Sequence, residues 1–208
     1  MNVAIILAAG NSSRFLSETP KQLYPINNRA VVSYSIDLLT KNFDQSVVVT
    51  NSRCYDQIKR FTPYVLKNDI DCRLKSIEIA LSFFDETSNI ENILIHDAAR
   101  PFISQENIDK LFDSQQYYPY SQFYLKLING LAKRTNSGYL IVDRDDHIEL
   151  CTPQLVNYDL YRSLFNMFVK PKLTWELIPI MDTLKIEYNL IEGSLKDLRK
   201  ITTINDLF

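Results

Sequence analysis

The side chains best suited to chemistry follow the ends of two apolar runs. The first run belongs to VAIILAAGNSSRF, residues 3–15, which turns polar at Gly10 and then carries Arg14. A strand that ends in such a loop can point backbone N–H groups at an anion, and Lys21 of the nearby TPKQ adds a second cation. The loop matches neither GxGxxG nor GxxxxGK[ST], because Gly10 is its one glycine. Taken alone, this stretch predicts only a buried strand with a tight turn.

A second polar cluster, HDAARPF at 96–102, continues the apolar run NILIH at 92–96. Ligands of α/β proteins bind at the carboxyl ends of the strands, so both clusters are expected at one edge of a sheet. We expect His96 to cap the strand end rather than act as a base. For Asp97 and Arg100 the favoured role is an ion pair that holds the loop, ahead of direct ligand contact.

Strand-like apolar runs alternate with helical patterns over the first 112 residues. The alternation predicts βαβ units and a parallel sheet. The expected strands are 3–8, 46–50, 64–67 and 92–96, and the expected helices are 30–43, 53–61, 75–84 and 104–112.

The pattern changes after about residue 120. SQFYLKLI at 121–128 predicts a strand, and LVNYDLYRSLFNMF at 155–168 predicts a helix. GYLIVDRDDHIEL at 138–150 predicts a hairpin that turns around Asp145 and Asp146. We therefore predict one domain over residues 1–208, with an arm excursion at about 136–152.

The composition narrows the class of protein. With 46% hydrophobic residues the chain can bury a core, and a net charge of -2 gives no basic field for nucleic acid. Cys54, Cys72 and Cys151 form no CxxC, which is typical of reduced thiols in a cytosolic protein. The apolar run at 3–9 is too short to span a membrane. These observations predict a cytoplasmic protein without nucleic-acid or membrane partners.

Four segments carry a resemblance to a known family. LAAGNSSRF…TPKQ, IHDAARPF, CTPQL and RKITTINDL are similar, in order and spacing, to the 2-C-methyl-D-erythritol 4-phosphate cytidylyltransferases and to related enzymes acting on ribitol 5-phosphate. The resemblance spans essentially the whole chain. It implies an α/β three-layer Rossmann-like nucleotidyltransferase fold with a mostly parallel twisted sheet and a projecting β-hairpin arm. It also implies a homodimer in which each arm completes the partner's site.

The implied reaction moves CMP from CTP to a sugar-alcohol phosphate and releases pyrophosphate, with Mg²⁺ as cofactor. The second pKa of a phosphate monoester is about 6, so the acceptor needs no general base. Such a reaction calls for amides and cations that align and neutralise two polyanions.

The resemblance assigns roles by motif position. Ala8, Ala9 and Gly10, with Asn11 and Ser12, would approach CTP. Arg14 and Lys21 would hold its phosphates, and Lys200 would face the reacting phosphates as the third catalytic residue. Arg73 and Ser76 would flank the base and ribose, and Asp97 belongs to the same CTP side. The metal ligands are not assigned.

Two departures from the family affect the CTP side. Ser12 stands where the family usually has a glycine, and serine tolerates positive φ poorly, so we expect this loop to be reshaped or relaxed. Ile70 replaces a glycine near the cytosine, which is expected to narrow the base pocket.

More departures fall on the acceptor side, where the family carries hydroxyl, carboxylate and arginine groups. The positions concerned are Gly130, Leu131, Ile141, Tyr158 and Trp175. Lys133 and Arg134 remain from the basic part of that motif. Two interpretations stay open: a transferase for methylerythritol phosphate, ribitol 5-phosphate or another polyol phosphate, and a nucleotide-binding homologue with little or no transferase activity. Transfer of a nucleotide with another base is a weaker third.

Overall fold

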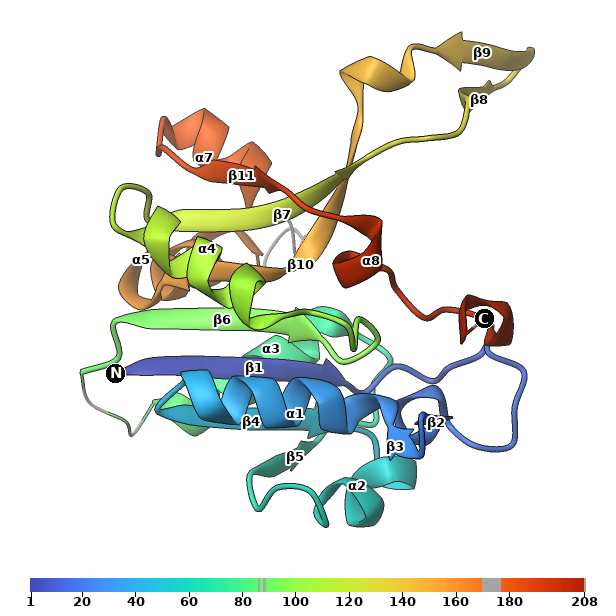
Figure 1. Cartoon of the computed structure of the whole chain (residues 1–208). Helices are drawn as coiled ribbons and strands as arrows, with labels where there is room; N and C mark the ends of the chain where they lie inside the picture. Colours follow the sequence, from blue (N-terminus) through green and yellow to red (C-terminus); the bar gives the residue numbers. More distant parts are fainter. Residues whose placement is uncertain (86, 88, 170–176, 208) are drawn as a thin grey trace.

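The computed structural model describes residues 1–85, 87, 89–169 and 177–207, and a twisted seven-stranded sheet forms its centre (Figure 1). The strand order is β11 (Asn189–Glu192), β7 (Tyr120–Lys126), β10 (Ile148–Asn157), β6 (Asn92–Asp97), β1 (Asn2–Ala8), β4 (Gln45–Thr50) and β5 (Val65–Lys67). Neighbouring strands are parallel except where β10 lies antiparallel to β6 and β7. The predicted mostly parallel sheet is confirmed.

Strand β1 lies at the centre because both of its faces are apolar. Ala4 and Ile6 face one hydrophobic cluster, Val3 and Ile5 face another, and all four are fully buried. A strand covered on both sides reads as a continuous apolar run, which is what VAIILA shows.

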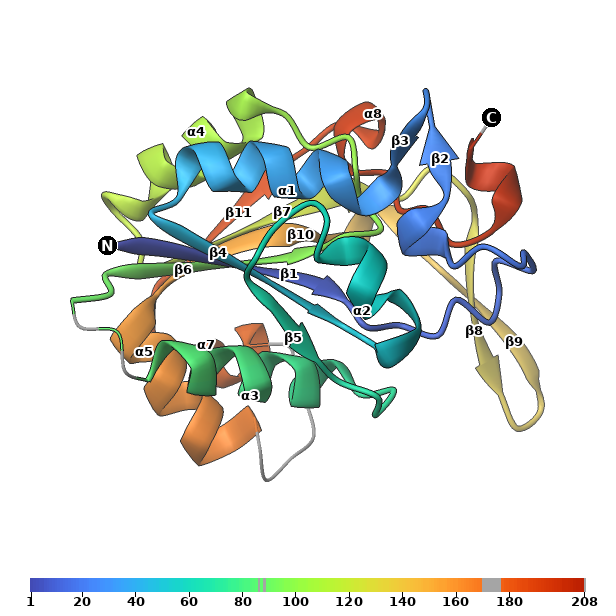
Figure 2. The ribbon, with the colours of Figure 1, turned by 90° about the horizontal axis from the view of Figure 1, so that it is seen from below.

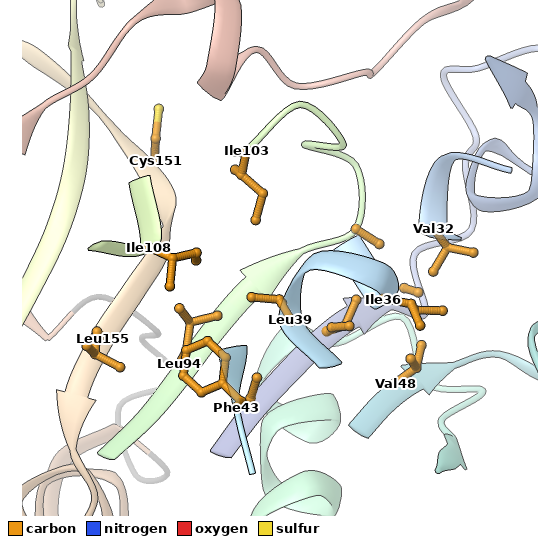
Figure 3. Close-up of a cluster of buried hydrophobic side chains, with 14 of the residues drawn as sticks. Val32, Ile36, Leu39, Phe43, Val48, Leu94, Ile103, Ile108, Cys151 and Leu155 are labelled. Atoms are coloured by element: carbon orange, nitrogen blue, oxygen red, sulfur yellow. The ribbon is translucent and has the colours of Figure 1, made fainter. Parts of the chain in front are cut away.

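One face of the sheet is covered by α1 (Val31–Asn42), α2 (Ser52–Ile58), α4 (Gln105–Gln115) and the short α8 (Leu195–Leu198). Ile36, Leu39 and Phe43 from α1 and its end meet Leu94 of β6 and Ile108 of α4 in this layer (Figure 3). Helix α4 begins with a capping box between Ser104 and Asn107. Preceding α1 are the short 3-10 helix η1 (Lys21–Leu23) and the strands β2 (Pro25–Ile26) and β3 (Arg29–Ala30).

The opposite face is covered by α3 (Arg73–Phe84), α5 (Tyr158–Leu164) and α7 (Ile178–Leu184), as Figure 2 shows. Ile77, Leu81 and Phe84 pack there with Tyr161 and Met181. Helices on both faces complete the predicted three layers. Among the helices described, none combines the length and apolarity needed to cross a membrane.

The arm is a hairpin of β8 (Leu131–Thr135) and β9 (Gly138–Val142) that projects from the sheet (Figure 1). Its strands turn at residues 136–137, so the prediction of a turn around Asp145 and Asp146 is wrong. A two-residue connection followed by Gly138 at φ 141° closes the hairpin earlier. Asp145 and Asp146 lie in the 3-10 helix η2 (Arg144–Asp146), which begins where the Asp143 side chain accepts a hydrogen bond from the Asp145 amide.

The arm therefore starts before the predicted range of 136–152, and the chain has rejoined the main sheet in β10 by Ile148. The helix predicted over 155–168 also begins late, because Leu155–Asn157 still belong to β10. Asn157 then caps α5 by accepting from the Leu160 amide at 3.0 Å. Apolar residues occur on both sides of Asn157, so the apolar pattern does not reveal where the buried strand gives way to the helix.

Candidate active site

A pocket of about 240 Å³ opens at the carboxyl ends of β1 and β6. It gathers the loop after β1, helix η1, the loop before α3, the end of β6 and the C-terminal segment. Its lining residues are Leu7, Ala8, Ala9, Gly10, Lys21, Gln22, Ile70, Asp71, Cys72, Arg73, Ser76, Asp97, Ala98, Ala99 and Lys200. Segments far apart in sequence thus meet at the sheet edge where the sequence predicted an anion site.

Gln22 holds the loop after β1 in place. Its side chain, only 3% exposed, donates from Nε2 to the carbonyls of Ala8 at 2.6 Å and Gly10 at 2.7 Å. With these carbonyls directed at Gln22, the amides of Gly10, Asn11 and Ser12 donate no hydrogen bond within the described chain. Such free amides beside cations suit an anion.

Ser12 keeps the left-handed conformation that a glycine would adopt, with φ 56°. The expectation that the loop would be reshaped or relaxed at this serine is therefore wrong. Its hydroxyl donates to Gln22 Oε1 at 3.0 Å, a hydrogen bond that glycine could not make. This bond offsets part of the conformational cost of positive φ.

Asp97 forms the charged centre of the pocket. One carboxylate oxygen pairs with Arg73 and the other accepts from Lys200 Nζ at 2.7 Å. The predicted ion pair between Asp97 and Arg100 is wrong, because only a backbone bond of 2.9 Å from the Arg100 amide to the Asp97 carbonyl joins the two residues.

Arg100 instead anchors the C-terminal segment. Its buried guanidinium donates to the Leu198 carbonyl and lies 3.5 Å from Glu149. This contact, two residues before Lys200, helps to place the lysine at Asp97.

The electrostatics follow from these contacts. Burial alone would raise the pKa of Asp97, but Arg73 and Lys200 outweigh it and hold that pKa well below its usual range. Burial, reinforced by the charge of Lys200, lowers the pKa of Lys21. The pocket thus holds a firmly ionised carboxylate among several cations. It is these cations that suit the pocket to a polyanionic ligand.

His96 belongs to the core rather than to the pocket, which agrees with the predicted structural role. It is fully buried, and its Nε2 lies 3.2 Å from Ser35 Oγ and 3.1 Å from the Arg100 carbonyl. Burial lowers its pKa to about 4. His147, at the base of the arm, is exposed.

Most of the predicted CTP-side residues line this pocket, namely Ala8, Ala9, Gly10, Lys21, Arg73, Ser76, Asp97 and Lys200. Asn11, Ser12 and Arg14 lie on the adjoining loop outside its lining, and the Arg14 side chain is exposed. Sequence reasoning gave no role to Leu7, Gln22, Asp71, Ala98 or Ala99. Gln22 offered a signal, because a glutamine beside Lys21 supplies both a donor and an acceptor for a loop backbone.

The acceptor-side departures divide into two groups. Gly130, Leu131 and Ile141 line a shallow hollow at the base of the arm, together with Val142, Asp143 and Arg144. Tyr158 lies elsewhere: its amide donates to the Glu91 carbonyl at 2.9 Å, at the end of the sheet opposite the pocket. Within this chain Tyr158 is therefore distant from the pocket. Trp175 lies outside the described residues.

The sequence pattern of the IspD family, the 2-C-methyl-D-erythritol 4-phosphate cytidylyltransferases, matches residues 2–208. The chain belongs to this family. A relative named for that activity in Thermotoga neapolitana is 32% identical over 170 residues, covering 78% of this chain and 75% of the relative. Another from Thermosipho africanus is 28% identical over 218 residues, covering 100% and 95%. The predicted enzyme class, nucleotidyltransferase, is thereby confirmed.

Solved structures of the IspD family share the fold. The 4-diphosphocytidyl-2C-methyl-D-erythritol synthase of Anaerococcus prevotii superposes with a TM-score of 0.81 at 20% identity, covering 100% of this chain and 94% of that one. The Thermus thermophilus 2-C-methyl-D-erythritol 4-phosphate cytidylyltransferase gives 0.79 at 20% identity, covering 100% and 96%. At this identity the comparison establishes the architecture, and the site must be argued from the residues of this chain.

Proposed function

We propose that this chain transfers CMP from CTP to 2-C-methyl-D-erythritol 4-phosphate and releases pyrophosphate. The observation that carries the proposal is the pocket in which Lys21, Arg73 and Lys200 surround Asp97 beside the free amides of the loop after β1. This arrangement offers cations and N–H donors to a triphosphate at the sheet edge where α/β proteins bind ligands. Membership of the IspD family supports the choice of substrates.

The chemistry needs alignment more than proton transfer. A phosphate oxygen of the acceptor attacks the α-phosphorus of CTP, and the bond from that phosphorus to the oxygen bridging the β-phosphate breaks. The leaving pyrophosphate takes the electron pair, so its growing charge must be neutralised. Lys21, Arg14 and the loop amides are assigned to these phosphates, and Lys200 to the reacting phosphates. No residue is needed as a base, in keeping with the buried, neutral His96.

Mg²⁺ fits this site through the Asp97 carboxylate. Asp97 is ionised and lines the pocket, and each of its oxygens keeps acceptor capacity beyond its one cation partner. Mg²⁺ at nucleotide sites is usually held by one or two carboxylates together with phosphate oxygens and water. Bound there, the ion would neutralise phosphate charge. No cluster of three or more potential protein ligands occurs in the described part of the chain, so the nucleotide would have to supply the remaining ligands.

The arm supports a homodimer. Tyr139 and Ile141 on β9 are 73% and 80% exposed, although a two-stranded hairpin is marginally stable by itself. A second copy of the chain would cover these side chains and bring Lys133 and Arg134 of the arm to the partner's site. Sedimentation should show a dimer that Tyr139→Ser weakens and Tyr117→Ser does not, since Tyr117 is equally exposed but distant from the arm. A monomeric wild-type protein would contradict this part of the proposal.

A second acceptor deserves testing because Gly130, Leu131 and Ile141 cluster in one hollow. Three apolar or small residues at one site favour a changed acceptor contact, for which ribitol 5-phosphate is the candidate.

The test is pyrophosphate release from CTP and Mg²⁺ with a panel of polyol phosphates and a Lys21→Ala control. Release with methylerythritol phosphate, lost in the control, is the expected result. Pyrophosphate release only with another acceptor would mean that this acceptor, and not methylerythritol phosphate, is the substrate. No release from folded protein that binds CTP would favour a nucleotide-binding homologue without transferase activity.

A further inference from the structure

We propose that Asn68 is a positioning residue for the nucleotide, acting through Ser76 and through the loop at residues 69–72. The inference rests on the proposed function, because it takes the pocket beside this loop to hold CTP. Asn68 follows β5 directly and is only 3% exposed, yet it does not line the pocket itself. Any influence on the nucleotide must pass through the groups that it contacts.

The Asn68 amide bridges the loop from inside. Its Oδ1 accepts from the Ile70 amide at 3.0 Å, and its Nδ2 donates to Ser76 Oγ at 2.8 Å and to the Cys72 carbonyl at 3.3 Å. A backbone N–H can only donate and a carbonyl can only accept, so the two backbone partners fix which end of the amide is which. The Nδ2 group therefore faces Ser76 as a donor.

This donor determines what the Ser76 hydroxyl can do. Because the Ser76 oxygen accepts from Asn68, its own proton is left for another acceptor. Within the protein that proton is directed at the Cys72 carbonyl, 3.4 Å from Oγ, which is long for an O–H donor. Ser76 lines the pocket, so a ligand oxygen at ordinary distance would compete well for the proton. Asn68 thus prepares Ser76 as a donor toward the pocket.

The same contacts shape the loop itself. Ile70, Asp71 and Cys72 line the pocket, and no glycine occurs between Asn68 and Arg73 to give the backbone freedom. Instead, Asp69 is fastened to the start of α2 by the Ser52 amide at 2.7 Å and the Ser52 hydroxyl at 2.6 Å. Asn68 fastens the other side. A loop held at both ends presents these three residues to the nucleotide in one arrangement, which lowers the entropy cost of binding.

The experiment compares Asn68→Ala with Asn92→Ala. Asn92 is also a buried asparagine with two side-chain partners, Asn2 and Gln115, but it lies at the opposite end of the sheet. Calorimetric titration with CTP should show binding about tenfold weaker in Asn68→Ala, as expected for a lost buried hydrogen bond at a site. Asn92→Ala should bind CTP like the wild type. Turnover at saturating CTP should change much less than the affinity does in Asn68→Ala.

Two further variants keep the experiment decisive if the first one is ambiguous or does not fold. In a Ser76→Ala background, the Asn68→Ala change should weaken CTP binding clearly less than tenfold, because the contribution through Ser76 is already lost and only the contribution through the loop remains. If Asn68→Ala does not fold, Asn68→Ser serves in its place, since a serine can still accept from the Ile70 amide but cannot reach Ser76.

Equal CTP affinity in folded Asn68→Ala and Asn92→Ala would overturn the inference while leaving the proposed function intact. Full additivity with Ser76→Ala would equally contradict action through Ser76. A wild-type protein that binds no CTP would overturn both the inference and the proposed function. Binding without turnover of any acceptor would contradict only the proposed function, because the affinities would still decide the role of Asn68.

Discussion

The pocket and the arm are built on opposite principles. Around the pocket, Gln22, Asn68 and Arg100 are all buried, and each hydrogen-bonds to the backbone of a segment that lines the pocket or carries one of its residues. On the arm, Tyr139 and Ile141 are exposed and contact no hydrophobic cluster of the described chain.

This contrast teaches where each half of the proposed site comes from. The proposed CTP side lies within one chain, where Asp97 pairs with Arg73 and Lys200 and Gln22 fastens the loop after β1. The acceptor side gathers small and apolar residues on a hairpin that nothing in the described chain covers. We therefore expect substitutions at the pocket to act within their own chain, and substitutions on the arm to act on a partner.

The largest effect is expected from Lys21→Ala, which removes a cation from the CTP side. Pyrophosphate release should fall about a thousandfold, the upper range for the loss of one group that stabilises developing charge. Lys110→Ala is the matched control, because Lys110 is an exposed lysine of α4 that pairs with Glu106. If pyrophosphate release fell less than tenfold in Lys21→Ala, the pocket would not be the site of the reaction.

The two histidines, one buried near the pocket and one exposed beside the arm, should differ in how they affect the pH dependence of stability. His96 has a pKa of about 4 when folded and an ordinary value of 6.5, so between these values the unfolded chain binds more protons. Its contribution to stability is complete above pH 6.5 and falls as the pH falls, by about 3 kcal/mol at pH 4. Urea titrations over this range should show this loss of stability in the wild type. The control variant His147→Gln, which replaces an exposed histidine beside the arm, should show the same loss. A His96→Gln protein with the same pH dependence as the wild type would contradict the burial argument.

A smaller effect is expected from the paired change Lys133→Ala and Arg134→Ala on the arm. The KM for the acceptor should rise about tenfold, as for loss of a charged hydrogen bond, while the CTP affinity stays unchanged. Lys59→Ala with Arg60→Ala removes the same adjacent residue types from an exposed site after α2 and should alter neither. An equal effect of the arm variant on CTP affinity would break the division between the two halves.

The smallest effect concerns Ser12, where two contributions oppose each other. Ser12→Gly relieves the positive φ but loses the bond to Gln22, so its unfolding free energy should stay within about 0.5 kcal/mol of the wild type. Ser12→Ala loses the bond and keeps the strain, so it should be less stable by about 1 kcal/mol. Thermal unfolding measures both variants, and equal stability of the two would show that φ carries no cost here.

The sequence was sufficient to predict the strands and loops that form the pocket. Continuous apolar runs such as 3–8 and 92–96 identify strands buried on both faces, and the polar residues that follow them mark the sheet edge. Lys21, Arg73 and Lys200 were assigned from motif order, and the structure brings them to one pocket.

The sequence could not show which charges pair. Asp97 and Arg100 are three residues apart, yet Asp97 pairs with Arg73 and Lys200, which are distant in the chain, because the strand end directs its side chain into the pocket. Gln22 and Asn68 were given no role for a related reason: most of their partners are backbone groups, which leave no mark on residue type. On the arm, alternating residues predicted a hairpin but not its turn, since no core fixes its register.

The central claim is that one chain supplies the CTP side and its partner supplies the arm. Mixing Lys21→Ala protein with the Lys133→Ala, Arg134→Ala protein tests it directly, at an acceptor concentration well below the KM. If arms act across the dimer, subunit exchange creates one intact site per mixed dimer, and the rate should approach about one quarter of the wild-type rate. A rate that stays near one twentieth, about the mean of the two separate proteins under the same assumptions, would contradict the claim.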